Sequence, residues 1–435
     1  MSENIKKEDF LTEARAEINE VDKQMEELFV RRMQAAQRIA AYKEEHELPI
    51  LDAAREAEVI ANNANRISTL TDDADVCNYY LSFLRNNMAL SRAYQHTVMS
   101  KAEIHVGAGS CDVFVERGAL DQAGKLLSLD RKVLVVTDSG VPAEYAAKVA
   151  KQCREAHVVT VPEGEGSKSL ATLEVLLSVM LQNGFDRSDC VAAVGGGVVG
   201  DLAGFAASVF MRGIDFYNVP TTVLSQVDSS IGGKVAVNFE GVKNIVGAFY
   251  QPKAVLIDPD VLSTLPKRQI ANGLAEAVKM ALISDAELFE IFERGEAIEK
   301  IDTVIKRALR IKKTIVEYDE KESDLRRILN FGHTLGHGIE AASEGALYHG
   351  ECVALGMIPM CAPDVRARLI AVLHSLGLPT EFEGDIESAL HFTSHDKKRE
   401  DDFINAVFVD AVGSSNTQKM PLKEWQNYIR EQIGG

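Results

Sequence analysis

The chain has 435 residues, of which 46% are hydrophobic and 26% are charged. These values fit a globular protein of about three domains and exclude extensive disorder. The formal net charge of −18 argues against nucleic acid or an anionic membrane as the main partner. The sequence shows no apolar signal segment, no bilayer-length apolar run and no C-x-x-C pair. We therefore expect a cytoplasmic protein with reduced thiols.

Residues 1–98 are expected to form an all-helical domain, because they contain no glycine and only one proline, Pro49. An amphipathic helix is predicted over about residues 8–45, where apolar residues are spaced 3, 4 and 3 apart at Ile18, Val21, Met25 and Leu28. Such a helix, about 60 Å long, is too long to be covered by one small domain, so we expect an intertwined helical dimer. Asp52 should cap a second helix, and a third is expected over about 74–95.

Two cations share the face of the first helix that should be apolar. Arg32 continues the apolar stripe, and Lys43 follows eleven residues later, about 20° from the same direction. A buried cation needs an anionic partner, so either a structural ion pair with Asp52 or Glu56 or a pocket for an anionic ligand would explain them. Arg15 points about 100° away from Arg32, so we expect it to serve the pocket of a partner subunit.

This arrangement resembles the all-helical chorismate mutase family. The resemblance implies a rearrangement of chorismate to prephenate, which requires only orientation and charge stabilisation of a dianion. It implies carboxylate contacts from Arg32, Arg55 and a partner's copy of Arg15, and hydrogen bonds to the ether oxygen from Lys43 and Gln95. Glu56 would hold the ring hydroxyl, and the full set of implied chorismate-binding residues is Arg15, Arg32, Lys43, Asp52, Arg55, Glu56 and Gln95.

Residues 99–260 are expected to form a Rossmann-like α/β domain. Three apolar runs, each followed by a glycine-containing turn, predict buried parallel strands at 132–137, 156–161 and 190–194. Helical stretches lie between them, which is the pattern of a parallel sheet.

Two polar or glycine-rich segments of this domain predict a nucleotide or polyanion site. Residues 195–200 fit G-x-G-x-x-G after a strand, where backbone N–H groups can approach a pyrophosphate. A tight structural turn is the alternative, since only Asp215 lies near the position of the usual downstream acidic residue. Residues 220–234 combine threonines, serines, Asp228 and Lys234, which favours a polyanion site over a solvated loop.

Residues 261–435 are expected to be mostly helical and to bind a metal. His333, His337 and His349 fall within 17 residues, and the first two share a helix face because they are four apart. Glu276 offers a carboxylate on an upstream helix. Two histidines and a carboxylate with an open position form a catalytic zinc arrangement, but spacing alone does not tell which two histidines bind the metal.

Together these segments resemble the 3-dehydroquinate synthase family over residues 102–435. The matching stretches are PEGEGSK, GGGVVGDLAGF, PTTVLSQVDSSIGGK, GVKNIVGAFYQP, GLAEAVK, LNFGHTLGH, HGE and HDKK. The resemblance implies an NAD domain followed by a helical metal domain, usually as a homodimer. It implies that DAHP, a seven-carbon sugar-acid phosphate, becomes 3-dehydroquinate and phosphate, with NAD regenerated in each turnover and Zn2+ or Co2+ polarising the oxidised hydroxyl.

The resemblance also assigns residues to roles. It selects Glu276, His333 and His349 as metal ligands. The implied NAD site comprises Asp138, Glu165, Lys168, Gly196, Gly197, Val198, Asp201, Thr221, Thr222, Lys234, Lys243 and Thr264. The implied substrate contacts are Asp228, Lys234, Asn244, Lys279, Lys312, Arg326, Asn330, His337 and Lys397, with Arg212 reaching the site of a partner subunit.

The sequence therefore predicts a bifunctional enzyme of aromatic amino acid biosynthesis with small-molecule substrates. One alternative makes the N-terminal domain a non-catalytic sensor of chorismate or prephenate. Another keeps the NAD and metal domains but changes the substrate to that of another sugar-phosphate cyclase or of a metal-dependent polyol dehydrogenase. The dense lysine and arginine set disfavours the dehydrogenases.

Overall fold

The computed structural model describes residues 2–45, 51–98, 101–106, 109–318, 325–393 and 403–434. The chain divides into two compact units, Met1–Ala102 and Glu103–Gly435, and each is described by itself. None of the described helices combines the length and the apolar character of a membrane span.

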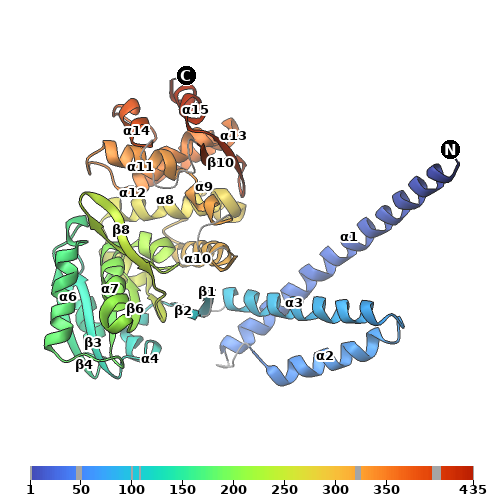
Figure 1. Ribbon diagram of the computed structural model, residues 1–435, viewed down its shortest axis with the longest axis horizontal. Helices are drawn as coiled ribbons and strands as arrows, with labels where there is room; N and C mark the ends of the chain where they lie inside the picture. Colours follow the sequence, from blue (N-terminus) through green and yellow to red (C-terminus); the bar gives the residue numbers. More distant parts are fainter. Residues whose placement is uncertain are drawn as a thin grey trace. The chain divides into compact units, whose positions relative to one another are not determined.

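The N-terminal unit consists of three helices, α1 (Ser2–Glu45), α2 (Ala53–Ile67) and α3 (Ala74–Val98), which confirms the all-helical prediction (Figure 1). The α1 helix begins earlier and α3 ends later than expected. Asp52 caps α2 as predicted, because its side chain accepts the backbone N–H of Arg55 at 2.9 Å. The C-terminal part of α1 packs on α3, where Ala36, Ala40 and Met88 are buried.

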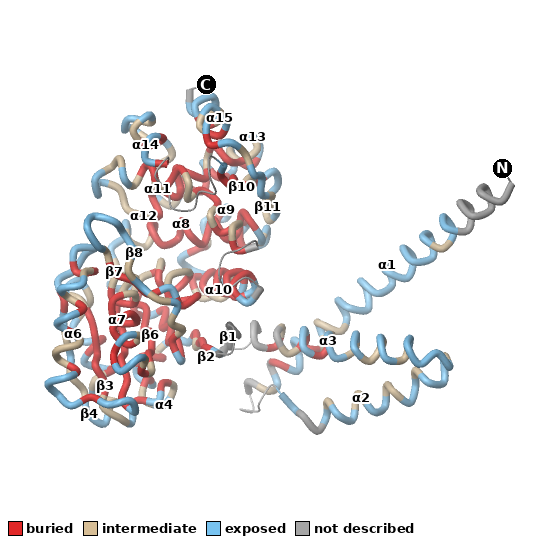
Figure 2. The backbone as a smooth tube through the Cα atoms, in the orientation of Figure 1, coloured by how far each residue is buried: buried red, intermediate tan, exposed pale blue. Residues whose placement is uncertain are grey.

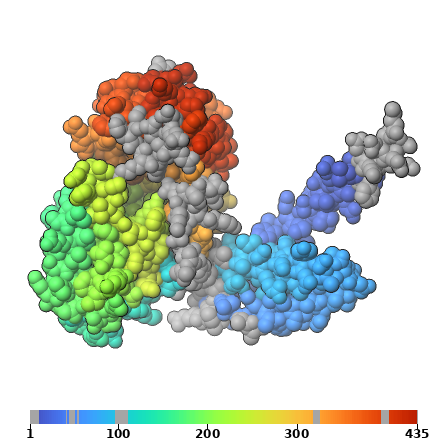
Figure 3. Space-filling view, in the orientation of Figure 1, coloured from blue at the N-terminus to red at the C-terminus, as the bar shows by residue number. Residues whose placement is uncertain are grey.

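The other helices of the N-terminal unit leave the apolar stripe of α1 between Ile18 and Leu28 uncovered (Figure 2). The exposed fractions are 58% for Ile18, 48% for Val21, 42% for Met25 and 59% for Leu28. In the space-filling view this part of α1 stands apart from α2 and α3 (Figure 3).

The C-terminal unit is built on a seven-stranded sheet in the order β1-β2-β9-β6-β5-β3-β4. The pairings from β2 through β9, β6, β5 and β3 to β4 are parallel. Three of these strands match the predicted runs to within one residue at each end. The strands are β1 (Lys101–Val106), β2 (Gly109–Val115), β3 (Lys132–Asp138), β4 (Glu155–Val161), β5 (Cys190–Gly195), β6 (Asp215–Pro220) and β9 (Ala254–Ile257).

Helices cover both faces of this sheet, so the carboxyl ends of its strands are left to form a site. One core joins the sheet to α6 (Leu170–Gln182) and α7 (Gly197–Val209), and the other joins it to α4 (Ala123–Leu126) and α5 (Ala143–Ala150). An antiparallel hairpin, β7 (Lys234–Phe239) and β8 (Val242–Phe249), packs on α7 through Val235 and Val237.

The rest of the C-terminal unit is mostly helical and is centred on α8 (Lys267–Ser284), which is buried from Ala271 to Ile283 (Figure 2). Around it lie α9 (Ala286–Glu293), α10 (Ile301–Tyr318), α11 (His333–Ala342), α12 (His349–Met357), α13 (Pro363–Leu376), α14 (Ile386–Thr393), α15 (Leu422–Gly434) and the hairpin β10 (Phe403–Ala411) and β11 (Ser414–Pro421). Short helical turns complete it: η1 (Ala119–Gln122), η2 (Glu165–Ser167), η3 (Phe210–Arg212), η4 (Ser225–Ser229), η5 (Pro259–Thr264), η6 (Leu325–Asn330) and η7 (Ile358–Met360).

Two glycines of α12 allow its close packing against α8 and α11. A Cβ atom on Gly350 would lie 1.9 Å from the carbonyl oxygen of Asn272, and one on Gly356 would lie 2.0 Å from that of Gly332. No larger side chain fits at either position without moving a backbone. These contacts set α12 beside the helices that carry the other predicted metal ligands.

Candidate active sites

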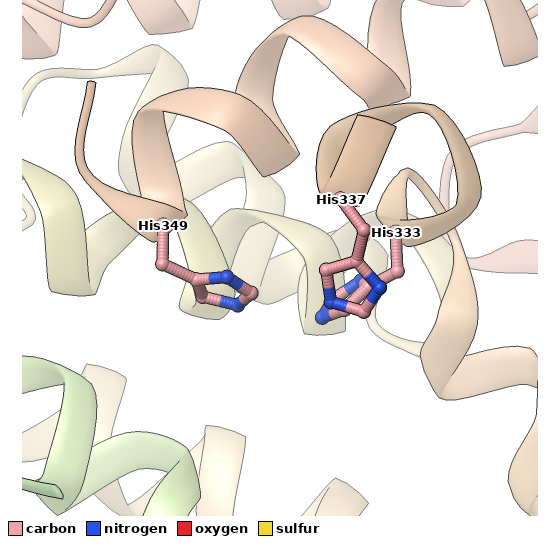
Figure 4. Close-up of side chains that lie close together, drawn as sticks. All are labelled: His333, His337 and His349. Carbon is pink, nitrogen blue, oxygen red and sulfur yellow. The ribbon is translucent and has the colours of Figure 1, made fainter. Parts of the chain in front are cut away.

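Three helices bring the predicted metal ligands of the C-terminal unit together. Glu276 lies on α8, His333 and His337 lie on the first two turns of α11, and His349 is the first residue of α12. The three imidazole rings face one another (Figure 4), with centroids 5.3 to 5.8 Å apart. Each histidine presents one ring nitrogen within 4.8 Å of the others.

Glu276 is the buried centre of this cluster, with a side chain that is 1% exposed. Its Oε1 atom lies 3.4 Å from Nε2 of His333 and 3.5 Å from Nε2 of His349, and its Oε2 atom lies 2.5 Å from Nζ of Lys279. Burial raises the pKa of Glu276, but Lys279 and the two histidines hold it well below its ordinary value. Neither carboxylate oxygen has a hydrogen bond of good geometry among the described residues.

The second ring nitrogens explain why this cluster suits a cation. Nδ1 of His333 lies 3.0 Å from the carbonyl oxygen of Phe331, and Nδ1 of His349 lies 2.9 Å from Oε2 of Glu340. Both partners only accept hydrogen bonds, so each Nδ1 carries a proton and Nε2 is the nitrogen of each ring that faces Glu276. Burial lowers the pKa of His349, but the nearby carboxylates of Glu276 and Glu340 raise it to about 9. The residues therefore fit a divalent metal held by nitrogen and oxygen ligands.

Buried cations lie beside this cluster. Nζ of Lys312, on α10, lies 2.7 Å from Oδ1 of Asp228, and burial lowers the pKa of Lys312 with a further contribution from the charges of Arg326 and Lys279. Asp228 lies on the π-helical turn η4, so the polar segment 220–234 is not a solvated loop. Arg326 is 4% exposed and sits against Gly232, where an added Cβ would lie 2.7 Å from its Nη2 atom.

The glycine-rich motif forms the turn between β5 and α7, at the carboxyl edge of the sheet. The first N–H groups of any helix have no intrahelical acceptor. The N-cap residue of α7 is Gly196, which has no side chain to accept from them. An added Cβ on Gly196 would lie 3.2 Å from Cγ2 of Thr222, and one on Gly197 would lie 3.2 Å from Oγ of Ser229. A side chain at either position would be tight against its neighbour, and the amides at the start of the helix suit an anionic phosphate.

Other predicted cofactor residues gather at the same edge. Asp138 ends β3, accepts the N–H of Gly140 at 2.8 Å, and lines a pocket of about 370 Å³. Several of the others make side-chain hydrogen bonds to a neighbour. Lys168 bonds both Asp201 and Asn244 at 2.5 Å, and Lys243 bonds Glu340 at 2.6 Å. Glu165 bonds Asn238 at 2.8 Å, and Thr264 bonds Tyr145 at 3.0 Å. Thr221 follows β6 and is buried, while Val198 and Asp201 lie on α7.

The remaining predicted residues lie elsewhere or outside the described residues. Lys234 is exposed at the start of β7, and Asn330 is the last residue of η6. Arg212 is exposed on η3 and has a left-handed backbone with φ of 70°. Arg15 is exposed on α1, about 25 Å along the helix from Arg32. Lys397 lies outside the described residues.

The N-terminal unit contains a pocket of about 430 Å³ among its three helices. Six of the predicted chorismate-binding residues line it: Arg32, Lys43, Asp52, Arg55, Glu56 and Gln95. Arg32 donates to the carbonyl oxygen of Asn87 at 3.0 Å and to Ser91. Glu56 forms its ion pair with Arg92. The structural ion pair between Arg32 and Glu56, one of the two explanations considered for the sequence, is therefore not observed.

Sequence reasoning missed Arg92 and Glu340. Arg92 lies three residues before Gln95 on α3, so a helical wheel could have placed both on one face. Glu340 lies seven residues after His333 on α11, which is also the same face. In both cases the signal was present, but no motif pointed to the residue.

Comparison with known proteins gives the family. Residues 158–272 match the family model described as 3-dehydroquinate synthase N-terminal, and residues 273–399 match that described as 3-dehydroquinate synthase C-terminal. A 3-dehydroquinate synthase from Streptococcus thermophilus is 40% identical over 354 residues, which cover 76% of this chain and 100% of the relative. The chain belongs to the 3-dehydroquinate synthase family. A relative with the same name from Latilactobacillus sakei is 41% identical over 314 residues, covering 69% of this chain and 88% of that relative.

The N-terminal unit has a match of its own, because residues 14–96 match the family model described as chorismate mutase type II. Both predicted resemblances are thus confirmed. The chain joins a chorismate mutase type II domain to the two domains of a 3-dehydroquinate synthase, an enzyme combination of the shikimate pathway.

Solved structures confirm the fold class of the synthase unit. The structure of 2-deoxy-scyllo-inosose synthase complexed with carbaglucose-6-phosphate, NAD+ and Co2+ is 28% identical, with a TM-score of 0.70, and the match covers 76% of this chain and 99% of that chain. The structure of 2-epi-5-epi-valiolone synthase from Streptomyces hygroscopicus with NAD+ and Zn2+ is 27% identical, with a TM-score of 0.69 and coverage of 76% and 98%.

Proposed function

We propose that both halves of the chain are catalytically active. The synthase unit would convert DAHP to 3-dehydroquinate and phosphate, and the N-terminal domain would rearrange chorismate to prephenate. The observation that carries the synthase assignment is the convergence of a buried carboxylate, two imidazole Nε2 atoms and buried cations in one site. The bound NAD+ and the Zn2+ or Co2+ of the two similar solved enzymes support the same cofactors here.

We assign Glu276, His333 and His349 as the metal ligands and leave His337 to contact substrate. The orientation of both Nε2 atoms towards the buried Glu276 carboxylate supports this choice. When bound, the metal would polarise a ring hydroxyl and NAD would accept and return a hydride at that carbon. Phosphate groups of NAD would lie on the glycine turn of α7 at Gly196 and Gly197.

The synthase's own cations would hold the anionic groups of DAHP. Lys279, Lys312 and Arg326 are all buried, and charge–charge interactions are stronger in a buried site than in water. They would stabilise phosphate as it leaves, because the leaving group gains negative charge. Further proposed contacts from the chain are Asp228, Lys234, Asn244, Asn330 and Lys397, with Arg212 supplied by a partner subunit.

We expect the purified full-length protein to release phosphate from DAHP. Removal of the metal with a chelator should abolish release, and added Zn2+ should restore it. Lys312→Gln should lower kcat/KM by about 100-fold or more, because one positioned charged donor is lost. Lys306→Gln on the same helix is the matched control and should have little effect. No phosphate release by the metal-loaded wild type would contradict the synthase assignment.

The mutase assignment rests on the pocket of the N-terminal domain. Among the described residues that line it, four are cationic (Arg32, Lys43, Arg55 and Arg92) and two are acidic, so a dianion of the size of chorismate would find complementary charge there. The rearrangement needs no nucleophile, and the proposed roles of these residues are therefore binding and charge stabilisation.

Arg32→Ala should lower chorismate turnover by about 100-fold or more, because a half-buried charged donor of the pocket is lost. Its exposed neighbour on α1 provides the control, so Arg31→Ala should retain turnover. The assay follows the loss of chorismate absorbance with prephenate identified as the product, and phosphate release from DAHP should be unchanged in both variants. Equal turnover by Arg32→Ala and wild type would overturn the assignment.

The ion pair between Arg92 and Glu56 favours one second candidate function. Glu56 is the residue proposed to hold the ring hydroxyl of chorismate, and Arg92 already occupies its carboxylate. A domain that binds chorismate or prephenate without converting it would fit this arrangement. In that case the same assay would show no turnover, and chorismate would instead change the rate of the synthase.

We further propose that two copies of α1 pair in a homodimer, in the cytoplasm, where the thiols stay reduced. The exposed apolar stripe of α1 supports the pairing, because uncovered stripes of this length are unfavourable in water. The distance of Arg15 from its own pocket supports a role in the pocket of the partner.

Sedimentation velocity should give a mass of about twice the 47.6 kDa of the chain or a higher multiple. Leu28→Lys should weaken association through the N-terminal domain and lower mutase turnover, because a charge would be buried between the helices. Ala16→Lys, on the opposite face of α1, should leave both unchanged. A fully active Leu28→Lys mutase would contradict the shared pocket.

A further inference from the structure

Glu340 makes two strong contacts in opposite directions. Its Oε2 atom accepts a hydrogen bond from Nδ1 of His349 at 2.9 Å, and its Oε1 atom lies 2.6 Å from Nζ of Lys243. His349 begins α12 beside the metal cluster, whereas Lys243 lies on β8 of the hairpin that packs on α7. The carboxylate therefore joins the helical half of the synthase unit to its nucleotide half.

On the metal side, Glu340 determines how His349 is presented. A carboxylate only accepts, so Nδ1 keeps a proton and Nε2, which lies 3.5 Å from Oε1 of Glu276, is the nitrogen left for the metal. Outer carboxylates of this kind fix the ring orientation and raise the basicity of the ligand. The His333 ring is oriented in the same way by a neutral backbone carbonyl, that of Phe331. Of the two groups that accept from Nδ1 atoms, only Glu340 is charged.

On the nucleotide side, Lys243 continues into a chain of polar contacts. The next residue, Asn244, has a left-handed φ of 54° and accepts Nζ of Lys168 at 2.5 Å. Lys168 in turn lies 2.5 Å from Asp201 on α7, the helix that begins at the glycine turn. Side-chain contacts, together with the peptide bond between Lys243 and Asn244, therefore lead from His349 to Asp201 near the start of α7.

We propose that Glu340 is a positioning residue that couples metal binding to nucleotide binding. The inference rests on the proposed function, because it takes His349 as a metal ligand and the glycine turn as the NAD site. NAD binding would order the β7–β8 hairpin and so favour the contact between Lys243 and Glu340. This contact keeps the His349 ring oriented for the metal. By linkage, each ligand then raises the affinity for the other by the same factor.

The test measures Zn2+ affinity of the metal-free full-length protein by competition with a chromophoric chelator, without and with saturating NAD+. In the wild type NAD+ should tighten Zn2+ binding by about 5-fold or more. Glu340→Ala should weaken Zn2+ binding by about 10- to 100-fold and remove the effect of NAD+. Glu340→Gln should lie between, because its amide oxygen still accepts one hydrogen bond.

Lys243→Met removes the contact on the nucleotide side. At an NAD+ concentration shown by titration to saturate this variant, the enhancement of Zn2+ binding by NAD+ should be lost. Glu293→Gln, which changes a carboxylate paired with Arg368 on α13, is the control and should behave as wild type. Unchanged Zn2+ affinity in Glu340→Ala, or an enhancement by NAD+ that survives it, would overturn the proposal. If the wild type binds Zn2+ and NAD+ independently of each other, the coupling is wrong but the proposed function stands. If it binds neither ligand, the proposed function is wrong.

Discussion

The carboxylate of Glu276 lies in the middle of the buried helix α8, and its negative charge has to be balanced inside the protein. Lys279, one turn further on, balances part of it, and the imidazoles of His333 and His349 face the other oxygen. His349 can reach Glu276 only if α12 lies close to α8. This close packing depends on Gly350, where any side chain would meet the backbone of α8. The packing of the helical half is thus arranged around one charge.

Both units have to bind anionic substrates, and they place their cations differently. The chain carries a net charge of −18, yet both candidate sites concentrate cations for small anionic substrates. In the mutase domain the cations line an open pocket between helices, which is enough for a rearrangement that needs orientation and charge. In the synthase unit they are buried beside a candidate metal site, which suits a reaction that breaks a carbon–oxygen bond to phosphate.

Much of this arrangement could be predicted from the sequence. The strands β3, β4 and β5 are continuous apolar runs that end at glycine-containing turns, and their ends were predicted to within one residue. The histidine spacing predicted a metal site with Glu276 as its carboxylate, but only the family resemblance selected which two of the three histidines are ligands. The roles of Arg92 and Glu340 depend on contacts between helices, which spacing along one helix does not reveal. The early start of α1 was missed because its first turns lack the apolar period.

The most direct test of the central claim is a crystal structure with Zn2+ and NAD+, with the metal located by anomalous scattering at the zinc edge. We expect one ion per chain bound by Glu276, His333 and His349, with His337 outside the ligand shell. An ion held by His333, His337 and His349 with Glu276 unbound would contradict it, because the buried carboxylate would then be only a structural partner of Lys279.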